Sequence, residues 1–189
     1  KINYDNDLTQ YVLQIDVTPG GVAIKDAYGS IKEPWLRTFG LTAGVFDRPF
    51  GFEISYSSSN REAPERSRMY QTLFPGERDM GAKLEIMPPE GSAMSWFNFK
   101  VGLFTGVGPT AQENDNNKDL IGRAGFMLPM RDAGLEIDGG VSWYLGKVRS
   151  NQRAIYTMDA GSKSFAYDSS ASNNGAYFDR SYIGADVQI

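Results

Sequence analysis

The sequence predicts an all-β chain that forms part of a transmembrane antiparallel β-barrel. Three observations lead to this prediction. Apolar and polar residues alternate in runs of about ten residues, the polar positions carry full charges, and short and long connections alternate along the chain. A period of two is the period of a β-strand, because successive Cβ atoms point to opposite sides of a sheet. A sheet that is apolar on one side and charged on the other fits the wall of a membrane barrel.

The clearest alternation lies within residues 94–145. In its first run, large apolar residues share one face and polar or small residues share the other: Phe97, Phe99, Val101 and Leu103 against Asn98, Lys100 and Gly102. In its last run the same division recurs: Leu135, Ile137, Val141, Trp143 and Leu145 against Glu136, Asp138, Ser142 and Tyr144. We expect the aromatic face to contact lipid and the charged face to line a lumen.

About eight strands follow from such patterns, within a single domain that spans residues 1–189. The predicted strands are 8–17, 22–31, 37–46, 79–86, 97–103, 120–130, 135–145 and 183–189. Turns near residues 33, 89 and 132 are short, whereas 57–77, 106–118 and 149–178 read as long loops opposite them, beside one short turn near residue 19. Short connections at one end and long loops at the other are typical of membrane barrels. The alternation continues to Ile189, so we expect the chain to be an internal part of a larger barrel.

Composition excludes several classes of function. Apolar residues make up 41% and charged residues 22%, which suits a barrel in which only every second strand residue faces lipid. No run of about 18 apolar residues exists, so a helical membrane span is not expected. The absence of His and Cys excludes Ser-His-Asp catalysis and thiolate or imidazole metal sites. We expect no enzymatic activity, no cofactor and, at a net charge of −4, no nucleic-acid partner.

Three motifs between residues 41 and 84 carry a resemblance. They are Gly44-Val-Phe-Asp-Arg-Pro-Phe-Gly-Phe-Glu, Ser58-Ser-Asn-Arg-Glu-Ala-Pro-Glu-Arg-Ser and Leu73-Phe-Pro-Gly-Glu-Arg-Asp-Met-Gly-Ala, preceded by Lys25-Asp-Ala-Tyr. This stretch resembles the phosphate-selective porin family (the porin O and P group), especially its Bacteroidetes-type members. The resemblance implies an outer-membrane channel of a Gram-negative bacterium with roughly sixteen strands. It also implies a homotrimer, or a member of an envelope complex, in contact with lipid and lipopolysaccharide.

In such porins the third loop folds into the lumen and narrows it, which places a constriction at residues 57–77 of this sequence. The residues expected there are Arg61, Glu62, Glu65, Arg66, Arg68 and Arg78, and those expected along the pore wall are Lys83, Lys100, Arg123, Glu136 and Asp138. Rings of Arg or Lys favour anions, and the guanidinium group holds oxyanions in a bidentate fork. Arg and Glu are interleaved in the loop, however, so they could equally form an ion-pair lattice that stiffens it.

Three functions remain open on these residues. The first is passive diffusion of small anionic solutes such as phosphate. The second is a plugged or scaffold barrel that serves as a subunit of a larger cell-envelope complex. The third is a soluble, lipocalin-like barrel for an apolar ligand, which requires the Phe97 and Phe99 face to point inward. The acidic segment 113–119 could bind Ca²⁺, but it lacks the Gly and terminal Glu of an EF-hand loop, so we expect a solvated loop.

Overall fold

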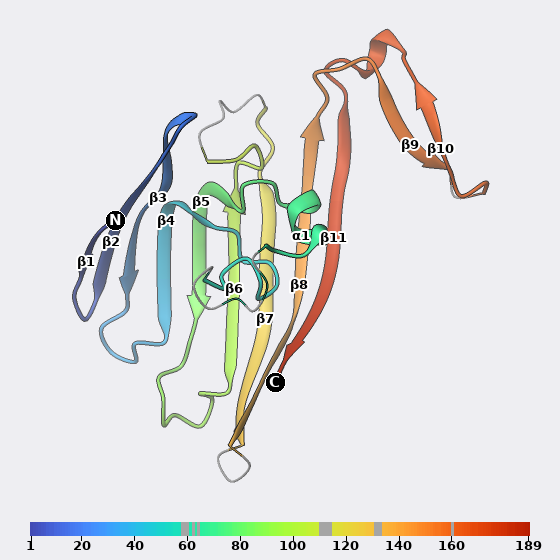
Figure 1. Ribbon diagram of the computed structural model, residues 1–189. Helices are drawn as coiled ribbons and strands as arrows, with labels where there is room; N and C mark the ends of the chain where they lie inside the picture. Colours follow the sequence, from blue (N-terminus) through green and yellow to red (C-terminus); the bar gives the residue numbers. More distant parts are fainter. Residues whose placement is uncertain (58–60, 62, 64, 110–114, 131–133, 160) are drawn as a thin grey trace.

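The protein is dominated by one antiparallel sheet. The computed structural model of the chain describes residues 1–57, 61, 63, 65–109, 115–130, 134–159 and 161–189. Nine strands follow one another in the sheet in sequence order (Figure 1). They are β1 (Ile2–Asp5), β2 (Thr9–Thr18), β3 (Gly21–Lys32), β4 (Phe39–Asp47), β5 (Arg78–Ile86), β6 (Phe97–Phe104), β7 (Asp119–Met130), β8 (Leu135–Arg149) and β11 (Tyr177–Gln188). The all-β prediction and the antiparallel order are therefore confirmed.

The sheet is a meander in which each strand pairs with its neighbours in the chain. Strand β1 forms one edge and β11 the other, and no ladder joins these two edges within the described part of the chain. Connections at one end are short, as in the turn 33–38, whereas residues 48–77, 105–118 and 150–176 form long connections at the other end. This division follows the order of loop lengths in the sequence.

The strand number exceeds the eight that were predicted. Strand β1 was missed, and the segment 149–178, predicted as a loop, contains a hairpin of β9 (Ile155–Asp159) and β10 (Ser164–Asp168), followed by a 3₁₀ turn, η2 (Ala171–Asn173). Figure 1 shows this hairpin standing away from the main sheet. The signal was hidden because Ser, Gly and Asn surround the two short alternations. A second omission is α1 (Arg68–Leu73), a single helical turn inside the predicted loop 57–77.

The two faces of the sheet divide as the alternation predicts. Leu103 is 54% exposed, whereas its neighbour Phe104 is fully buried on the opposite face. Tyr144, placed on the polar face of β8 by its position in the alternation, is also buried there. The face that carries Phe104 and Tyr144 is the inner face, and the other is the outer face. Large apolar side chains on the outer face stay exposed: Leu41, Leu84, Leu103, Val141, Leu145 and Ile183.

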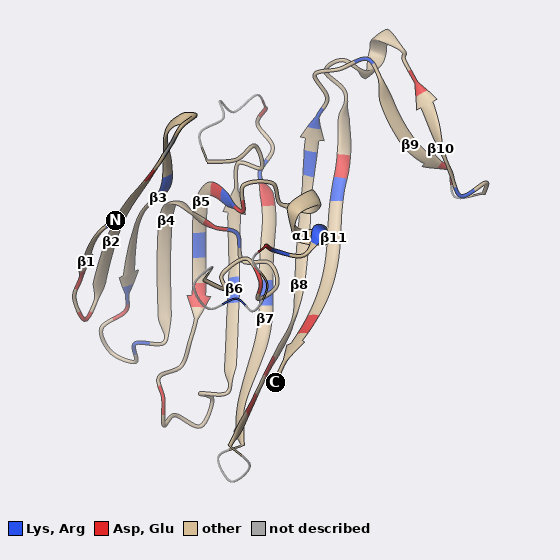
Figure 2. Cartoon of the chain, viewed as in Figure 1, with Lys and Arg blue, Asp and Glu red and all other residues tan. Residues whose placement is uncertain are grey.

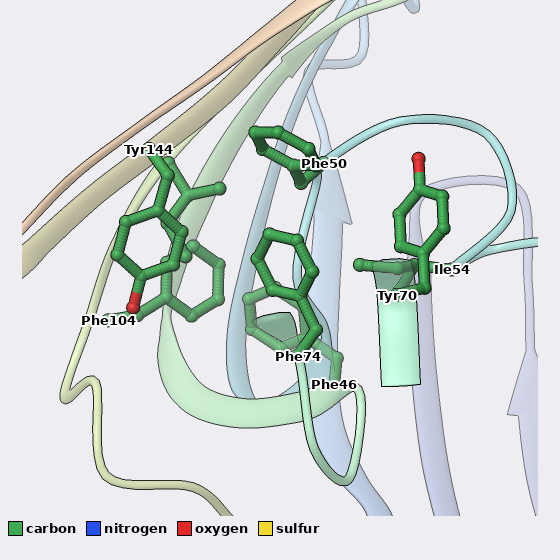
Figure 3. Packing of buried hydrophobic residues seen from close by; sticks show 8 residues of the cluster. Phe46, Phe50, Ile54, Tyr70, Phe74, Phe104 and Tyr144 are labelled. Carbon is green, nitrogen blue, oxygen red and sulfur yellow. The ribbon is translucent and has the colours of Figure 1, made fainter. Parts of the chain in front are cut away.

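Residues 48–77 are called the inner loop from here on, and their described part folds back across the inner face (Figure 1). Their apolar side chains and those of the sheet form one buried cluster: Phe46, Phe50, Ile54, Tyr70, Phe74, Phe104, Ile121 and Tyr144. Figure 3 shows Phe74 in the middle of this group, with its ring centroid 4.7 Å from that of Phe50 and 5.8 Å from that of Tyr144. Each buried aromatic side chain contributes roughly 1.5–3 kcal/mol by leaving water. The hydrophobic core thus joins the inner loop to the sheet.

Helix α1 depends on this packing. It has six residues, no side-chain cap at Ser67 and no basic residue in its last turn, so local signals for a helix are weak. Tyr70 is buried, and its ring contacts those of Phe50 and Phe74, which holds the turn in place. Within the described ranges, no helix has both the length and the apolar character needed to cross a membrane.

Candidate functional site

A pocket of about 700 Å³ lies between the inner loop and the inner face of strands β2–β7. Its lining contains ten Lys or Arg residues and four Asp or Glu residues. The whole chain has 19 basic and 23 acidic residues, so the pocket is cationic in an acidic protein. Figure 2 shows this concentration of charge on β5–β7 and on the loop that lies against them.

The inner loop is fixed at its first residues. The amide of Gly51 donates a buried hydrogen bond to Ser142 Oγ on β8, with an N···O distance of 2.8 Å. The loop therefore reaches from β4 across to β8. Gly51 has φ +61°, and a Cβ at this position would lie 1.6 Å from the Tyr70 hydroxyl oxygen. Glycine is required here both by the backbone conformation and by the close approach of Tyr70.

Buried carboxylates organise the end of the sheet from which the long loops leave. Asp79 has no exposed surface and lies 3.4 Å from Arg48 Nε. Its oxygens also accept hydrogen bonds from Thr105 Oγ1 and from the amide of Gly106, at 2.7 Å and 2.8 Å. Neutralisation by an arginine and several donors is the usual condition for a buried carboxylate. Asp79 thereby links the start of the inner loop to the loop after β6.

Asp119 has a matching role at the start of β7. It accepts hydrogen bonds from the Tyr144 hydroxyl and from the Arg180 guanidinium, and its carboxylate is almost completely buried. Arg180 also donates to the carbonyl oxygen of Gly106 at 2.9 Å, and its guanidinium carbon lies 5.0 Å from the Tyr144 ring centroid. The bases of the long loops are thus joined by charged hydrogen bonds.

Arg66 holds the inner loop in its folded shape. Its guanidinium group forms a forked ion pair with the Glu77 carboxylate and donates to the carbonyl oxygen of Ile54 at 2.9 Å. Burial raises the pKa of Glu77, but the hydrogen bond and the charge of Arg66 outweigh burial and lower the pKa overall. Only 9% of the Arg66 side chain is exposed. This geometry matches the ion-pair lattice that the interleaved charges allowed.

Arg78 continues the same network. Its Nε lies 2.6 Å from Asp26 on β3, and its terminal nitrogens lie 3.4 Å from Asp47 and 3.3 Å from Glu77. Three carboxylates surround one guanidinium, so the charge of Arg78 is fully compensated. The arrangement ties the end of the inner loop to β3 and β4.

The residues predicted for the pore wall separate into three groups. Lys83 and Lys100 line the pocket and share Glu85, at 2.6 Å and 3.9 Å. Arg123 also lines the pocket, and it pairs with Asp186 and, at 3.3 Å, with Asp138. Glu136 is exposed near the turn between β7 and β8 and does not line the pocket.

The residues predicted for the constriction are only partly brought together. Arg61 lines the pocket, and its buried Nε has no hydrogen-bond partner among the described residues. Arg66 and Arg78 line it too, but in the ion pairs given above. Glu65 and Arg68 are exposed outside the lining, and Glu62 lies outside the described residues.

Four cationic residues of the lining were not predicted: two of them lie on β3, and the other two are Lys1 and Arg48. Lys32 is the last residue of β3, and Lys25 lies in the middle of the same strand. They are an odd number of positions apart, so a regular strand would place them on opposite faces. Between β2 and β3, however, Gln14 pairs with Asp26 and Ile15 with Ile24, which leaves Lys25 as an extra residue in a bulge. The poor alternation around Lys25 was the sequence signal of this bulge.

Among the residues that can be placed, no group of three or more acidic, His or Cys side chains could hold a metal ion. The calcium alternative at 113–119 lies partly outside the described residues. Comparison of the chain with protein-family models, curated proteins and solved structures finds no match. The functional argument therefore depends on the geometry of this pocket and on the two faces of the sheet.

Proposed function

We propose that the chain forms part of the wall of an outer-membrane porin through which small anionic solutes, such as phosphate, diffuse passively. The observation that supports this most strongly is the reversed polarity of the sheet. Its charged face lies under the inner loop around a cationic pocket, and its apolar face is exposed. A lipocalin-like protein requires the opposite arrangement, with side chains such as Leu103 inside.

The exposed apolar face suits contact with lipid. Ile183, Val141 and Leu41 are 85%, 52% and 50% exposed, on β11, β8 and β4, so exposed apolar side chains occur on both halves of the sheet. In an aqueous compartment, a partner protein with a large interface would be needed to remove these side chains from water. In a membrane, the lipid chains cover them directly. No ladder covers the outer edges of β1 and β11 in the described ranges, and such edges cannot face hydrocarbon, so the proposal includes further strands that close the barrel.

The inner loop would set the width of the channel. It crosses the inner face from β4 to β8 and leaves the 700 Å³ pocket beside it. Lys and Arg side chains in a narrow, water-filled passage favour anions over cations. In this proposal the channel works as a homotrimer or within an envelope complex, surrounded by lipid and lipopolysaccharide.

Planar bilayers test the proposal directly. Purified full-length protein, folded and inserted into the bilayer, should give discrete conductance steps. In a KCl gradient, the reversal potential should have the sign of anion selectivity. Correctly folded, inserted protein that produces no steps would contradict the channel, and cation selectivity would contradict the choice of solute.

A second function, a plugged or scaffold barrel, is favoured by one specific observation. The β9–β10 hairpin exposes four large side chains on one face, because Phe165 pairs with Met158 and Tyr167 pairs with Tyr156. An isolated two-stranded hairpin is marginal in water, and a partner protein would stabilise it. Co-purification of a stoichiometric partner together with absent conductance would favour this function over the porin.

A further inference from the structure

We propose that Lys32, Glu85, Lys100 and Arg123 form a binding station for small oxyanions on the wall of the sheet, separate from the inner loop. These four residues are called the basic row. The inference deepens the porin proposal and rests on it for its physiological role. It assigns selectivity to the strands, whereas the sequence placed the selective arginines in the loop.

The register of the strands places these residues side by side. Lys32 on β3 is opposite Gly40 on β4, and Gly40 is opposite Glu85 on β5. Glu85 is opposite Lys100 on β6, and Lys100 is opposite Arg123 on β7. The row therefore crosses five neighbouring strands at one level. In Figure 2, the charged bands near the lower part of β5, β6 and β7 lie at about the same height.

All four side chains face the same space. Each of them lines the pocket, together with Lys83, which lies two residues before Glu85 on the same face of β5. Gly40 has no side chain, so the row is open between Lys32 and Glu85. Charges arranged across strands at one level form part of a ring around a lumen, which is the geometry that selects ions by sign.

The cations of the row exceed its single carboxylate. Glu85 serves both Lys83 and Lys100, at 2.6 Å and 3.9 Å. Lys32 has no carboxylate oxygen within ion-pair distance in the described ranges. By contrast, the charges of Arg66 in the inner loop and of Arg78 at the start of β5 are compensated by Glu77, Asp26 and Asp47. Lys32 and Lys100 thus leave positive charge on the wall that Glu85 does not fully compensate, and Arg61 is the inner-loop cation against which this wall charge has to be tested.

Lys100 and Arg123 form a directly opposed pair of like charges. Such pairs destabilise a sheet, and a break in a local folding rule often marks a functional site. Asp138 and Asp186 balance Arg123 from the side of β8 and β11, while among the described residues Lys100 has ion-pair contact only with the shared Glu85. A small oxyanion between Lys32 and Lys100 would relieve this excess, because ammonium groups bind phosphate-like ligands as point charges.

The test uses inorganic phosphate as the probe and the full-length protein in detergent micelles. Isothermal titration should detect phosphate binding to the wild-type protein. Lys32→Gln and Lys100→Gln remove one charge each without shortening the side chain greatly, and each should weaken phosphate binding about two- to fivefold, as expected for one unit charge in a wet site. The exposed Lys147→Gln serves as the matched control and should bind phosphate like the wild type.

The Arg61→Gln variant tests whether phosphate binds to the inner loop instead of the wall. Phosphate binding that survives this change but weakens in both row variants supports the basic row. Absence of binding to the wild type, unchanged binding in the row variants, or an equal loss in Arg61→Gln would overturn it. Circular dichroism confirms that each variant is folded. Conductance is measured separately, so binding without conductance would contradict the porin and leave the basic row supported.

Discussion

Replacement of Phe74 by alanine should release the inner loop while leaving the sheet folded. Phe74 is 1% exposed, and four aromatic rings surround it: those of Phe50, Tyr70, Tyr144 and Tyr182, with centroids between 4.7 Å and 6.0 Å away. A buried Phe→Ala change costs about 3–5 kcal/mol. Since the contacts of Phe74 join the loop to the sheet, we expect the change to lower the free energy of docking of the loop onto the sheet. The stability of the strand ladders should not change.

Hydrogen exchange measures the docking equilibrium at one informative amide. The Gly51 N–H donates to Ser142 Oγ in a buried position, so it exchanges only when the loop lifts from β8. A loss of about 3–5 kcal/mol accelerates this exchange about 10²- to 10⁴-fold, at about 1.36 kcal/mol per factor of ten. Amides within the β8–β11 ladder should keep their protection, and the exposed Phe165→Ala should change neither set. An unchanged Gly51 amide in Phe74→Ala would refute the role of the aromatic cluster in docking.

Two further perturbations act on the same loop through different forces. Gly51→Ala should loosen it, because the new Cβ would overlap the Tyr70 hydroxyl at φ +61°; Gly91→Ala, at φ +86° with no neighbour within 4 Å, controls for the backbone cost of about 1–2 kcal/mol. Adding Tyr70→Phe should restore part of the exchange protection, and no restoration would contradict the clash. The second perturbation is acid. Because Arg66 lowers the pKa of Glu77 below its usual 4.5, the ion pair stabilises the loop fully above pH 4.5 and is lost as pH falls through the lowered pKa. Loop exchange, corrected for its intrinsic pH dependence, should therefore rise only below pH 4.5, and Glu77→Gln should abolish this pH response.

The faces of the strands could be predicted from the sequence because the strand period is fixed by geometry. Leu103 and Phe104 are adjacent apolar residues, yet the alternation places them on opposite sides, and the structure agrees: one is exposed and the other fully buried. The same logic placed Tyr144 with the polar residues although its ring is large. Alternation gives the side of a residue, and it needs no knowledge of partners.

The ion-pair partners of the charged residues could not be predicted, because they depend on the register of the strands, which the sequence does not reveal. Arg78 and Asp26 are 52 positions apart and meet only because β3, β4 and β5 align at one level. The porin resemblance instead implied that Arg66, Arg68 and Arg78 lie together at a constriction. In the structure Arg66 and Arg78 form ion pairs with carboxylates, and Arg68 is exposed.

The strand bulge and the short helix were not predicted, because neither follows from a regular local sequence pattern. The bulge at Lys25 inserts one residue into a strand, so a strict period of two fails on one side of it. Helix α1 has no side-chain cap and depends on the packing of Tyr70 against Phe50 and Phe74 in the buried cluster. Both depend on tertiary contacts, which override local propensity.

The charged residues of the inner face fall into two groups, one that fixes the loops and one that can contact a solute. At the ends of strands, Asp79 and Asp119 are buried, and arginine and hydrogen-bond donors satisfy them, so these groups fix the bases of the loops and are shielded from solute. In the middle of the wall, Lys83 and Lys100 compete for one Glu85. A channel needs a rigid wall and charged groups that can exchange one solute for the next. A group that is already held in a complete ion pair gains no binding energy by contacting a solute, because it would have to give up its partner. Under-compensated lysines on a fixed wall meet both conditions, whereas the saturated guanidinium groups of Arg66 and Arg78 meet only the first.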